Sequence, residues 1–406
     1  MAIGTVLLHR MYGVNMSESL AIRGGDPVRE EELSFGSPFI GEDEIQAVED
    51  TLRSGWLTTG QRTNEFEETV SNRVGAEHGL ATTNCTSALY LAYRALGLSG
   101  EIITTPMTFA TTVSSAMMAG AEPKLADIRH DTLTLDPESV KEAITPNTEA
   151  IVPVHYAGQA VDMDAISEIA DDHDLAVIED AAHGLGGQYQ GTPQGTLGDV
   201  GCYSFYATKS ITTGEGGMLV TDRDEIADKV DRLRLAGVNK NAWRREDQDK
   251  PNWYYDVMDA SGKFNMNDLS ASIGLVQMER LDSFIETRQT VANRLDQQLE
   301  NVPFVRPLGV RDPTEHARHI YPILLSSEIE IDRISFDDAL NAEGIGTSVH
   351  YIPIHHHSAF EKVDRVELDV TESLADNLLC VPIHPEMDVT DADDVVRAIE
   401  KVVAAY

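Results

Sequence analysis

A lysine and two carboxylates lie just beyond the ends of predicted strands. Lys209 follows an apolar strand over Val200–Phe205, and Glu179 and Asp180 directly follow another over Leu175–Ile178. Open α/β sheets place ligand sites at the carboxyl ends of their strands. An amine in such a partly desolvated site has a lowered pKa and attacks carbonyl groups, and an upstream carboxylate can keep a pyridinium nitrogen protonated. These are the residue types that Schiff-base chemistry with pyridoxal phosphate uses.

A glycine-rich turn completes this stretch of the chain. Gly214–Gly217 follows Lys209 and leads into a third strand over Met218–Thr221. The alternative interpretation is an ordinary lysine on a loop, preceded by an acidic strand end. On spacing alone, the ordinary lysine is the favoured interpretation.

The elements that must position these residues follow an alternating pattern. Apolar runs of strand length alternate with segments of helical periodicity, at the interval of right-handed βαβ units, which predicts an α/β fold with a mostly parallel central sheet. Further along, the sequence predicts a long polar surface loop over 237–252 and a long helix over 268–300. A strand is predicted over 347–352 in the C-terminal part.

The chain of 406 residues is strongly acidic, with 68 acidic against 31 basic residues and a formal net charge of −37. Such a charge repels nucleic acid and anionic membranes, so we expect neither as a partner. The acidic residues are spread along the chain, which favours a solvated surface suited to a salt-rich (halophilic) cytoplasm. An acidic interaction surface is the alternative.

Cysteine usage and hydropathy also indicate the cytoplasm. The three cysteines are far apart and form no disulfide framework or zinc-binding pattern, which favours a reducing compartment. No apolar run approaches the roughly 20 residues of a membrane span. The apolar patch over 3–8 has no basic segment before it and is a poor signal peptide. We expect residues 1–15 to be a disordered arm, or to precede a true start at Met16.

Three motifs carry a resemblance to a known family: E-D-A-A-H-x-x-G from Glu179, G-D-V-x-x-x-S-F-x-x-x-K ending at Lys209, and T-G-E-G-G over 213–217. Together they resemble the DegT/DnrJ/EryC1/StrS family of sugar aminotransferases, from about Gly24 to the C-terminus. The resemblance implies the fold type I of pyridoxal-phosphate enzymes. It implies a large cofactor-binding domain over 16–275 and a smaller C-terminal α/β domain over 276–406.

The resemblance also implies which residues hold pyridoxal 5′-phosphate. Lys209 would form the Schiff base and Asp180 would pair with the pyridine nitrogen, so these two residues would carry the catalysis. His183 would lie by the phenolic oxygen of the cofactor. Ser204, the serine of S-F-x-x-x-K, would contact its phosphate.

A polar turn, Asn84–Ser87, precedes an apolar helix predicted over 88–98. A helix N-terminus is a ready anion site, because free backbone N–H groups and the helix dipole face the ligand. Thr86 and Ser87 would equally suit plain N-cap positions. The resemblance makes them phosphate contacts together with Cys85, which replaces the glycine usual in the family.

The resemblance assigns two further residues to the cofactor. The aromatic residue of T-F-A-T-T, Phe109, would stack on the pyridine ring, with an ordinary core position as the alternative. The segment G-K-F-N-M resembles a subgroup that includes enzymes acting on UDP-4-keto sugars, although Phe264 stands where that subgroup has tyrosine. Its asparagine, Asn265, would reach the cofactor phosphate of the other subunit, which implies a homodimer with shared active sites. A helix cap is the alternative for Asn265.

Candidate substrate contacts come from two segments. The loop S-G-W-L-T-T-G suits the approach of a ligand, and the resemblance places its Trp56 and Thr58 at the substrate entrance. Trp56 as a core anchor is the alternative. In V-H-Y-I-P-I-H-H-H the run of histidines suggests a metal site. The match to a family segment where histidine approaches the sugar favours His350 or His355 in the substrate pocket instead, and we expect no metal.

The sequence therefore predicts a transaminase that moves an amino group from an amino acid, by resemblance glutamate, to a nucleotide-linked keto sugar. The resemblance suggests a place in surface-glycan or amino-sugar biosynthesis. Two alternatives stay open. A dehydratase of the same family would carry histidine in place of Lys209, and a regulatory protein with the same fold would not need Lys209, Asp180 and Ser204 intact.

Overall fold

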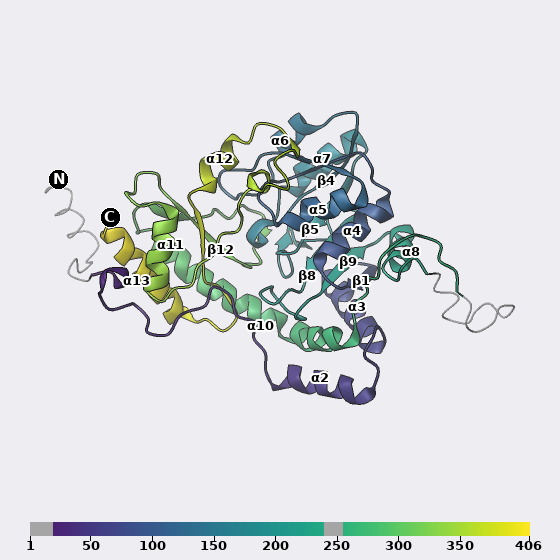
Figure 1. Cartoon of the computed structure of the whole chain (residues 1–406), viewed down its shortest axis with the longest axis horizontal. Coiled ribbons are helices and arrows are strands. Elements are labelled where there is room, and N and C mark those ends of the chain that lie inside the picture. Colours follow the sequence, from purple (N-terminus) through teal and green to yellow (C-terminus); the bar gives the residue numbers. More distant parts are fainter. Residues whose placement is uncertain (1–18, 239–254) are drawn as a thin grey trace.

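The computed structural model describes residues 19–238 and 255–406. The predicted arm, residues 1–15, and most of the predicted loop over 237–252 lie outside the described residues. Two α/β regions share one long helix, α10 (Asp268–Leu299), which runs beneath the larger region and on into the smaller one (Figure 1). The side chain of Asn267 caps this helix by accepting a hydrogen bond from the Ser270 N–H.

An eight-stranded sheet forms the centre of the larger region, in the order β1-β9-β8-β5-β4-β2-β3-β13. Only β9 runs antiparallel to its neighbours, so the sheet is mostly parallel, as the sequence predicts. The strands are β1 (His78–Thr82), β2 (Glu101–Thr104), β3 (Glu122–Leu125), β4 (Thr148–Val152), β5 (Ala176–Asp180), β8 (Val200–Ser204), β9 (Gly217–Thr221) and β13 (Asp364–Arg365).

Helices cover both faces of this sheet, which is why its strands are apolar at successive positions. Ile102 packs with α4 and α8 on one face, whereas the next residue, Ile103, packs with α6 and α7 on the other. The helices of this region are α2 (Glu42–Ser54), α3 (Gln61–Val74), α4 (Cys85–Leu96), α5 (Ala110–Ala119), α6 (Pro137–Ala143), α7 (Met163–His173) and α8 (Asp224–Leu233).

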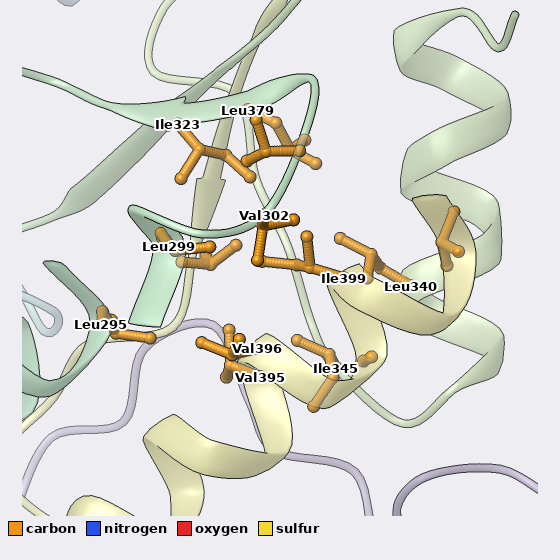
Figure 2. Close-up of a cluster of buried hydrophobic side chains, with 14 of the residues drawn as sticks. Leu295, Leu299, Val302, Ile323, Leu340, Ile345, Leu379, Val395, Val396 and Ile399 are labelled. Carbon is orange, nitrogen blue, oxygen red and sulfur yellow. The ribbon is translucent and has the colours of Figure 1, made fainter. Parts of the chain in front are cut away.

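The smaller region is built on an antiparallel sheet of β10 (Val305–Pro307), β12 (Tyr321–Leu325) and β14 (Leu378–Val381). Helices α11 (Arg333–Ala342) and α13 (Val389–Ala404) pack with the end of α10 around one apolar cluster. In Figure 2, Leu295 and Leu299 of α10 meet Ile323, Leu379 and Ile399 in this cluster. The remaining short elements are η1 (Ala21–Arg23), η2 (Tyr156–Gly158), β6 (Gln188–Tyr189), β7 (Thr192–Pro193), β11 (Thr314–Glu315), η3 (Ile354–His356) and α12 (Asp369–Ala375).

The prediction of a strand over 347–352 is wrong. Only Ser348 pairs, through one bridge to Cys380, because the chain then leaves the small sheet and its next side chains turn to a cavity in the larger region. The predicted domain division at residues 275 and 276 falls within α10, and β13 from beyond it joins the large sheet, so that division stays a prediction. Within the described ranges, no helix combines the length and apolar character that a membrane crossing needs.

Asp268, the first residue of α10, ties this helix to the start of α3. Its Oδ1 accepts hydrogen bonds from the Gly60 N–H (2.7 Å) and from the N–H and hydroxyl of Thr63 (3.0 and 2.7 Å), and the residue is only 3% exposed. This contact also fixes the end of the loop over 54–60.

We expect Asp268→Ala to lower the free energy of unfolding by about 3 kcal/mol, because buried donors lose their acceptor. Asp282→Ala on the same helix is the matched control. Its carboxylate is 83% exposed and pairs with Arg73, so the change should stay within about 0.5 kcal/mol. Denaturant unfolding of both variants at one salt concentration measures the difference. Equal losses would show that the Asp268 contacts contribute no more than a surface ion pair.

Candidate active site

A cavity of about 530 Å³ lies at the carboxyl ends of β5 and β8, where their last residues, Asp180 and Ser204, both line it. Neighbouring parallel strands end at the same edge of a sheet, and this brings the two residues together. The predicted site residues that line the cavity are Cys85, Thr86, Phe109, Asp180, His183, Ser204, Lys209 and His350. Ser87, Asn265, Trp56, Thr58 and His355 are outside its lining.

The amine of Lys209 is buried in this cavity. Burial disfavours the ammonium form and lowers the pKa of Lys209 to about 8, although the nearby Cys85 and Asp180 act in the opposite direction. Within the described residues no carboxylate lies close enough to form an ion pair with it; its Nζ lies 3.4 Å from His319 Nε2. An amine with this pKa is available as a nucleophile near neutral pH.

Asp180 presents a buried carboxylate to the same cavity. The residue is 4% exposed, and its carboxylate accepts hydrogen bonds from the Thr112 hydroxyl (2.7 Å) and the Ala182 N–H (3.1 Å). Burial nevertheless raises the pKa of Asp180, and these hydrogen bonds and Lys209 only partly offset it. Asp180 is therefore suited to face a cationic nitrogen.

The neighbouring carboxylate, Glu179, has a different role. It is completely buried on the other side of the strand, where it accepts hydrogen bonds from the N–H groups of Gly195, Leu197 and Gly198. His155 Nε2 lies 2.7 Å from the same carboxylate. Glu179 thus anchors the loop before β8, and of the two adjacent carboxylates only Asp180 faces the cavity.

His183 is a neutral imidazole in the cavity wall. Its Nδ1 accepts a hydrogen bond from the Ala157 N–H (3.2 Å), so the ring proton is on Nε2, which lies 3.0 Å from the Tyr351 hydroxyl. Burial lowers the pKa of His183 well below its usual range, and Lys209 adds to the effect. The ring is therefore fixed in orientation and uncharged.

The N-terminus of α4 forms another wall. The Asn84 side chain caps the helix by accepting hydrogen bonds from the N–H (2.9 Å) and hydroxyl (2.8 Å) of Ser87. Cys85 and Thr86 line the cavity, and the first N–H groups of a helix have no intrahelical acceptor. This N-terminus can therefore bind an anion. The Ser87 hydroxyl serves the cap, and its predicted contact with a phosphate stays a prediction.

Glycine at position 217 lets β9 approach this helix terminus. A Cβ on Gly217 would lie 2.4 Å from the carbonyl carbon of Asn84 and 2.6 Å from the Cys85 nitrogen, both of them backbone atoms. The glycine-rich turn noted in the sequence thus has a packing role beside the cavity.

Of the three candidates Phe109, Trp56 and Thr58, only Phe109 lines the cavity. Phe109 lines the cavity and is 59% exposed, so it is not a core residue. Trp56 is 55% exposed, which makes the core-anchor alternative wrong, and its Nε1 donates to the Thr59 carbonyl (3.1 Å). Thr58 is also exposed. Trp56 and Thr58 therefore lie outside the cavity, and their predicted contacts with the substrate stay predictions.

Asn265 likewise lies outside this cavity. Its amide donates to the Thr59 hydroxyl, and the Lys263 ammonium donates to its side-chain oxygen (3.2 Å). The alternative that Asn265 caps the following helix is wrong, because Asn267 does so. A contact from Asn265 to the cofactor of another subunit stays a prediction.

The histidine run divides between two places. His350 lines the cavity, stacks on Phe35 with ring centroids 5.2 Å apart, and has its pKa lowered to about 4 by burial and by Lys209. His355 is buried outside the cavity, where its Nε2 lies 2.6 Å from Glu372 Oε1, and His356 approaches the same oxygen at 3.2 Å. The substrate role of His355 and the expectation of no metal stay predictions.

Sequence reasoning missed two prominent residues of the cavity wall, His319 and Tyr351. Tyr351 follows His350 inside the quoted V-H-Y segment, so its position was available as a signal. His319 lies just before β12, and no local motif marks it.

The fold and the site define an α/β aminotransferase of the pyridoxal-phosphate type. The chain belongs to the DegT/DnrJ/EryC1/StrS aminotransferase family, whose family model matches residues 38–400. It is therefore a transaminase, and the cofactor of this family is pyridoxal 5′-phosphate.

Curated relatives and solved structures agree with this assignment. An uncharacterised protein of Methanocaldococcus jannaschii, MJ1066, is 40% identical over 93% of this chain and 99% of its own. The spore coat polysaccharide biosynthesis protein SpsC of Bacillus subtilis is 41% identical over 91% of this chain and 97% of its own.

Among solved structures, Helicobacter pylori PseC, an aminotransferase involved in the biosynthesis of pseudaminic acid, matches with a TM-score of 0.87 and 27% identity over 93% of this chain and 100% of that one. DesI, solved in the presence of its TDP-sugar product, matches with a TM-score of 0.86 and 29% identity over 95% and 96%. A sugar aminotransferase of Streptococcus pneumoniae, Spr1654, is solved in PLP and PMP forms; its PLP form matches with a TM-score of 0.85 and 29% identity over 92% and 99%.

The cavity residues fit pyridoxal 5′-phosphate. The Lys209 amine is buried with its pKa lowered to about 8, which suits the aldehyde, and the buried carboxylate of Asp180 suits a pyridinium nitrogen. The N-terminus of α4, approached closely by Gly217, suits the phosphate. These groups match the electrophilic, cationic and anionic parts of the cofactor.

We expect Gly217→Ala to weaken binding of pyridoxal 5′-phosphate at least ~10-fold, because the new Cβ must displace the backbone at the start of α4. Gly309→Ala is the control, since its added Cβ would have no neighbour closer than 3.5 Å. Titration of the cofactor-free proteins, followed by tryptophan fluorescence, measures the affinity. Equal affinities would mean that this helix terminus does not hold the cofactor.

Proposed function

We propose that this transaminase transfers an amino group from L-glutamate to a nucleotide-linked keto sugar. The observation that carries the proposal is the buried Lys209 amine, with its lowered pKa, in the same cavity as the buried Asp180 carboxylate. The TDP-sugar product of DesI supports the substrate class, and the G-K-F-N-M segment favours a UDP-linked 4-keto sugar. SpsC supports a role in polysaccharide biosynthesis.

In this proposal Lys209 attaches the cofactor and later moves a proton. When bound, pyridoxal phosphate supplies an electron sink for the carbon that loses its proton. The freed Lys209 amine takes that proton as a general base and returns it as a general acid. Its pKa of about 8 suits both roles near neutral pH.

In this proposal the other cavity residues bind and orient the cofactor and the sugar. Asp180 would stabilise a positive charge on the ring nitrogen, and the fixed, neutral His183 would hold the phenolic oxygen. Cys85, Thr86 and Ser204 would bind the phosphate. Phe109 would stack on the ring, and His350 would contact the sugar.

We further propose a homodimer with shared active sites. Trp56, Thr58 and Asn265 are outside the cavity of their own subunit, where they can serve a partner's cavity. Helix α2 lies along the outer side of α10 (Figure 1), and Ile45, Leu52 and Trp56 at this edge are more than half exposed. Burial of these large apolar side chains against a second copy of the chain would favour the dimer.

The setting that we propose is a reducing, salt-rich cytoplasm. Cys85, Cys202 and Cys380 are buried and free. The net charge of −37 supports a surface adapted to salt. The two alternatives are not adopted: Lys209 lies in the cavity where a dehydratase would have histidine, and the family is one of aminotransferases.

The direct test supplies ¹⁵N-labelled glutamate and a panel of UDP- and dTDP-linked keto sugars to the protein in high salt. Mass spectrometry should find ¹⁵N in one amino sugar product and 2-oxoglutarate as the coproduct. Label transfer from another amino acid would correct the donor alone. No transfer to any nucleotide sugar, with transfer to a free keto acid instead, would contradict the proposed acceptor.

We expect Lys209→Ala to abolish turnover, because it removes both the attachment point and the proton carrier. Asp180→Asn should keep covalent attachment of the cofactor but slow turnover at least ~10²-fold, because an amide cannot stabilise the charged ring nitrogen. Absorbance spectra and steady-state rates separate the two effects. Normal turnover by either variant would contradict its assigned role.

The pH dependence of cofactor attachment follows from the Lys209 pKa. Burial lowers this pKa to about 8, and only the neutral amine attacks an aldehyde. The rate of attachment to cofactor-free protein should therefore rise about 10-fold per pH unit below pH 8 and level off above it. Stopped-flow absorbance measures the rate. A rise that continues to pH 10 would show that the amine keeps its ordinary pKa.

A further inference from the structure

We propose that His319 is a positioning residue that holds the free amine of Lys209 in one orientation through Nε2. The inference rests on the proton-transfer role proposed above for Lys209 and goes beyond it. No motif marks His319 in the sequence, whereas its contacts place it beside the Lys209 amine. His319 Nε2 lies 3.4 Å from Lys209 Nζ, and both residues line the cavity.

The backbone of His319 is held on both sides. Its N–H donates to the carbonyl of Ala157 (3.0 Å), and its own carbonyl accepts from Arg288 Nη1 (2.9 Å). Arg288 comes from α10, is 1% exposed and also donates to the carbonyl of Ile383 (2.9 Å). His319 is therefore fixed between the η2 turn and the long helix.

The backbone is strained in both of the segments that the hydrogen bond between His319 and Ala157 joins. Arg318, just before His319, has φ of 50°, and Ala157, whose carbonyl accepts a hydrogen bond from the His319 N–H, has φ of 59°. Neither residue is glycine, and the left-handed region is sterically unfavourable for a residue that carries a Cβ. Such conformations persist only where surrounding contacts impose them, and they cluster at functional sites.

The ring of His319 is held as firmly as its backbone. It packs against His183 with ring centroids 4.3 Å apart, and His183 is itself fixed by the Ala157 N–H and the Tyr351 hydroxyl. His319 Nδ1 is buried and has no hydrogen-bond partner among the described residues, so the contact of Nε2 with Lys209 is the one polar contact of the ring there.

The charged groups around Lys209 and His319 determine which of the two residues donates the hydrogen bond between them. The groups that act on Lys209 and His319 are Asp180, Cys85, Arg288, His183 and His350. Burial lowers the pKa of His319 well below its usual range, and the positive Lys209 adds to this. His319 is therefore neutral, with its proton on Nδ1, and Nε2 accepts from the Lys209 ammonium.

A neutral acceptor of low basicity orients the ammonium without taking its proton. Lys209 must present one N–H to a carbon atom after it has gained the proton, and free rotation of a long side chain would spread that N–H over many directions. His319 binds another N–H of the same ammonium and so restricts this freedom. It gains and loses no proton itself.

The first test uses the cofactor-free protein. The midpoint of the pH profile for acetylation of Lys209, followed by peptide mass spectrometry, reports the pKa of the amine. His319→Leu should shift this midpoint to lower pH, with acetylation at pH 7 about threefold faster or more, because the ammonium loses its acceptor. His319→Gln, which keeps an acceptor, should stay near the parent midpoint.

The second test uses the cofactor-loaded enzyme and glutamate. His319→Leu should lower the rate constant of the donor half-reaction about 10- to 100-fold with little change in the glutamate concentration for half-saturation, because binding is intact and the amine is misaligned. His319→Gln should recover most of the rate. His384→Leu, which removes another buried histidine outside the cavity lining, is the control and should leave both readouts unchanged.

Two results would overturn the inference: a parent-like acetylation midpoint in His319→Leu, or equal damage in His319→Gln and His319→Leu, which would indicate packing alone. A parent enzyme that fails to transaminate would contradict the proposed function instead. In that case the acetylation midpoints still decide whether His319 holds the amine.

Discussion

The structure depends on the burial of one amine and one carboxylate in a single cavity. Removal from water lowers the pKa of Lys209 and raises that of Asp180, so the same physical cause drives both groups toward neutrality. In the function proposed above, this burial is offset by a ligand that would offer an aldehyde to Lys209 and a cationic nitrogen to Asp180. The parallel strands β5 and β8, which end side by side, bring the two segments together.

The adjacent acidic residues Glu179 and Asp180 make different contacts because of the geometry of their strand. Successive side chains of β5 point to opposite sides, so Asp180 faces the cavity while Glu179 holds the loop before β8. The smaller region completes the cavity from the other direction. Helix α10 passes through both regions, and its buried Arg288 secures the segment that carries His319. The cavity is therefore formed by both regions and by the helix that joins them.

Much of the fold and the core of the candidate site could be predicted from the sequence, because they follow from local patterns. The alternation of strands and helices indicates the parallel sheet, and Lys209 and Asp180 belong to short motifs that also fix their place at strand ends. His319 could not be predicted in this way, since its position depends on Ala157 and Arg288, which are far from it in the sequence. For the same reason one histidine run contains both His350, in the cavity, and a histidine turned to Glu372.

The central claim is that the amine of Lys209 binds the cofactor covalently. The most direct measurement is to incubate the purified protein with pyridoxal 5′-phosphate in high salt, reduce it with borohydride and map the modified peptide by mass spectrometry. We expect one pyridoxyl group, on Lys209, and its loss when glutamate is added before the reduction. Modification of another lysine, or of none, would contradict the proposed attachment to Lys209.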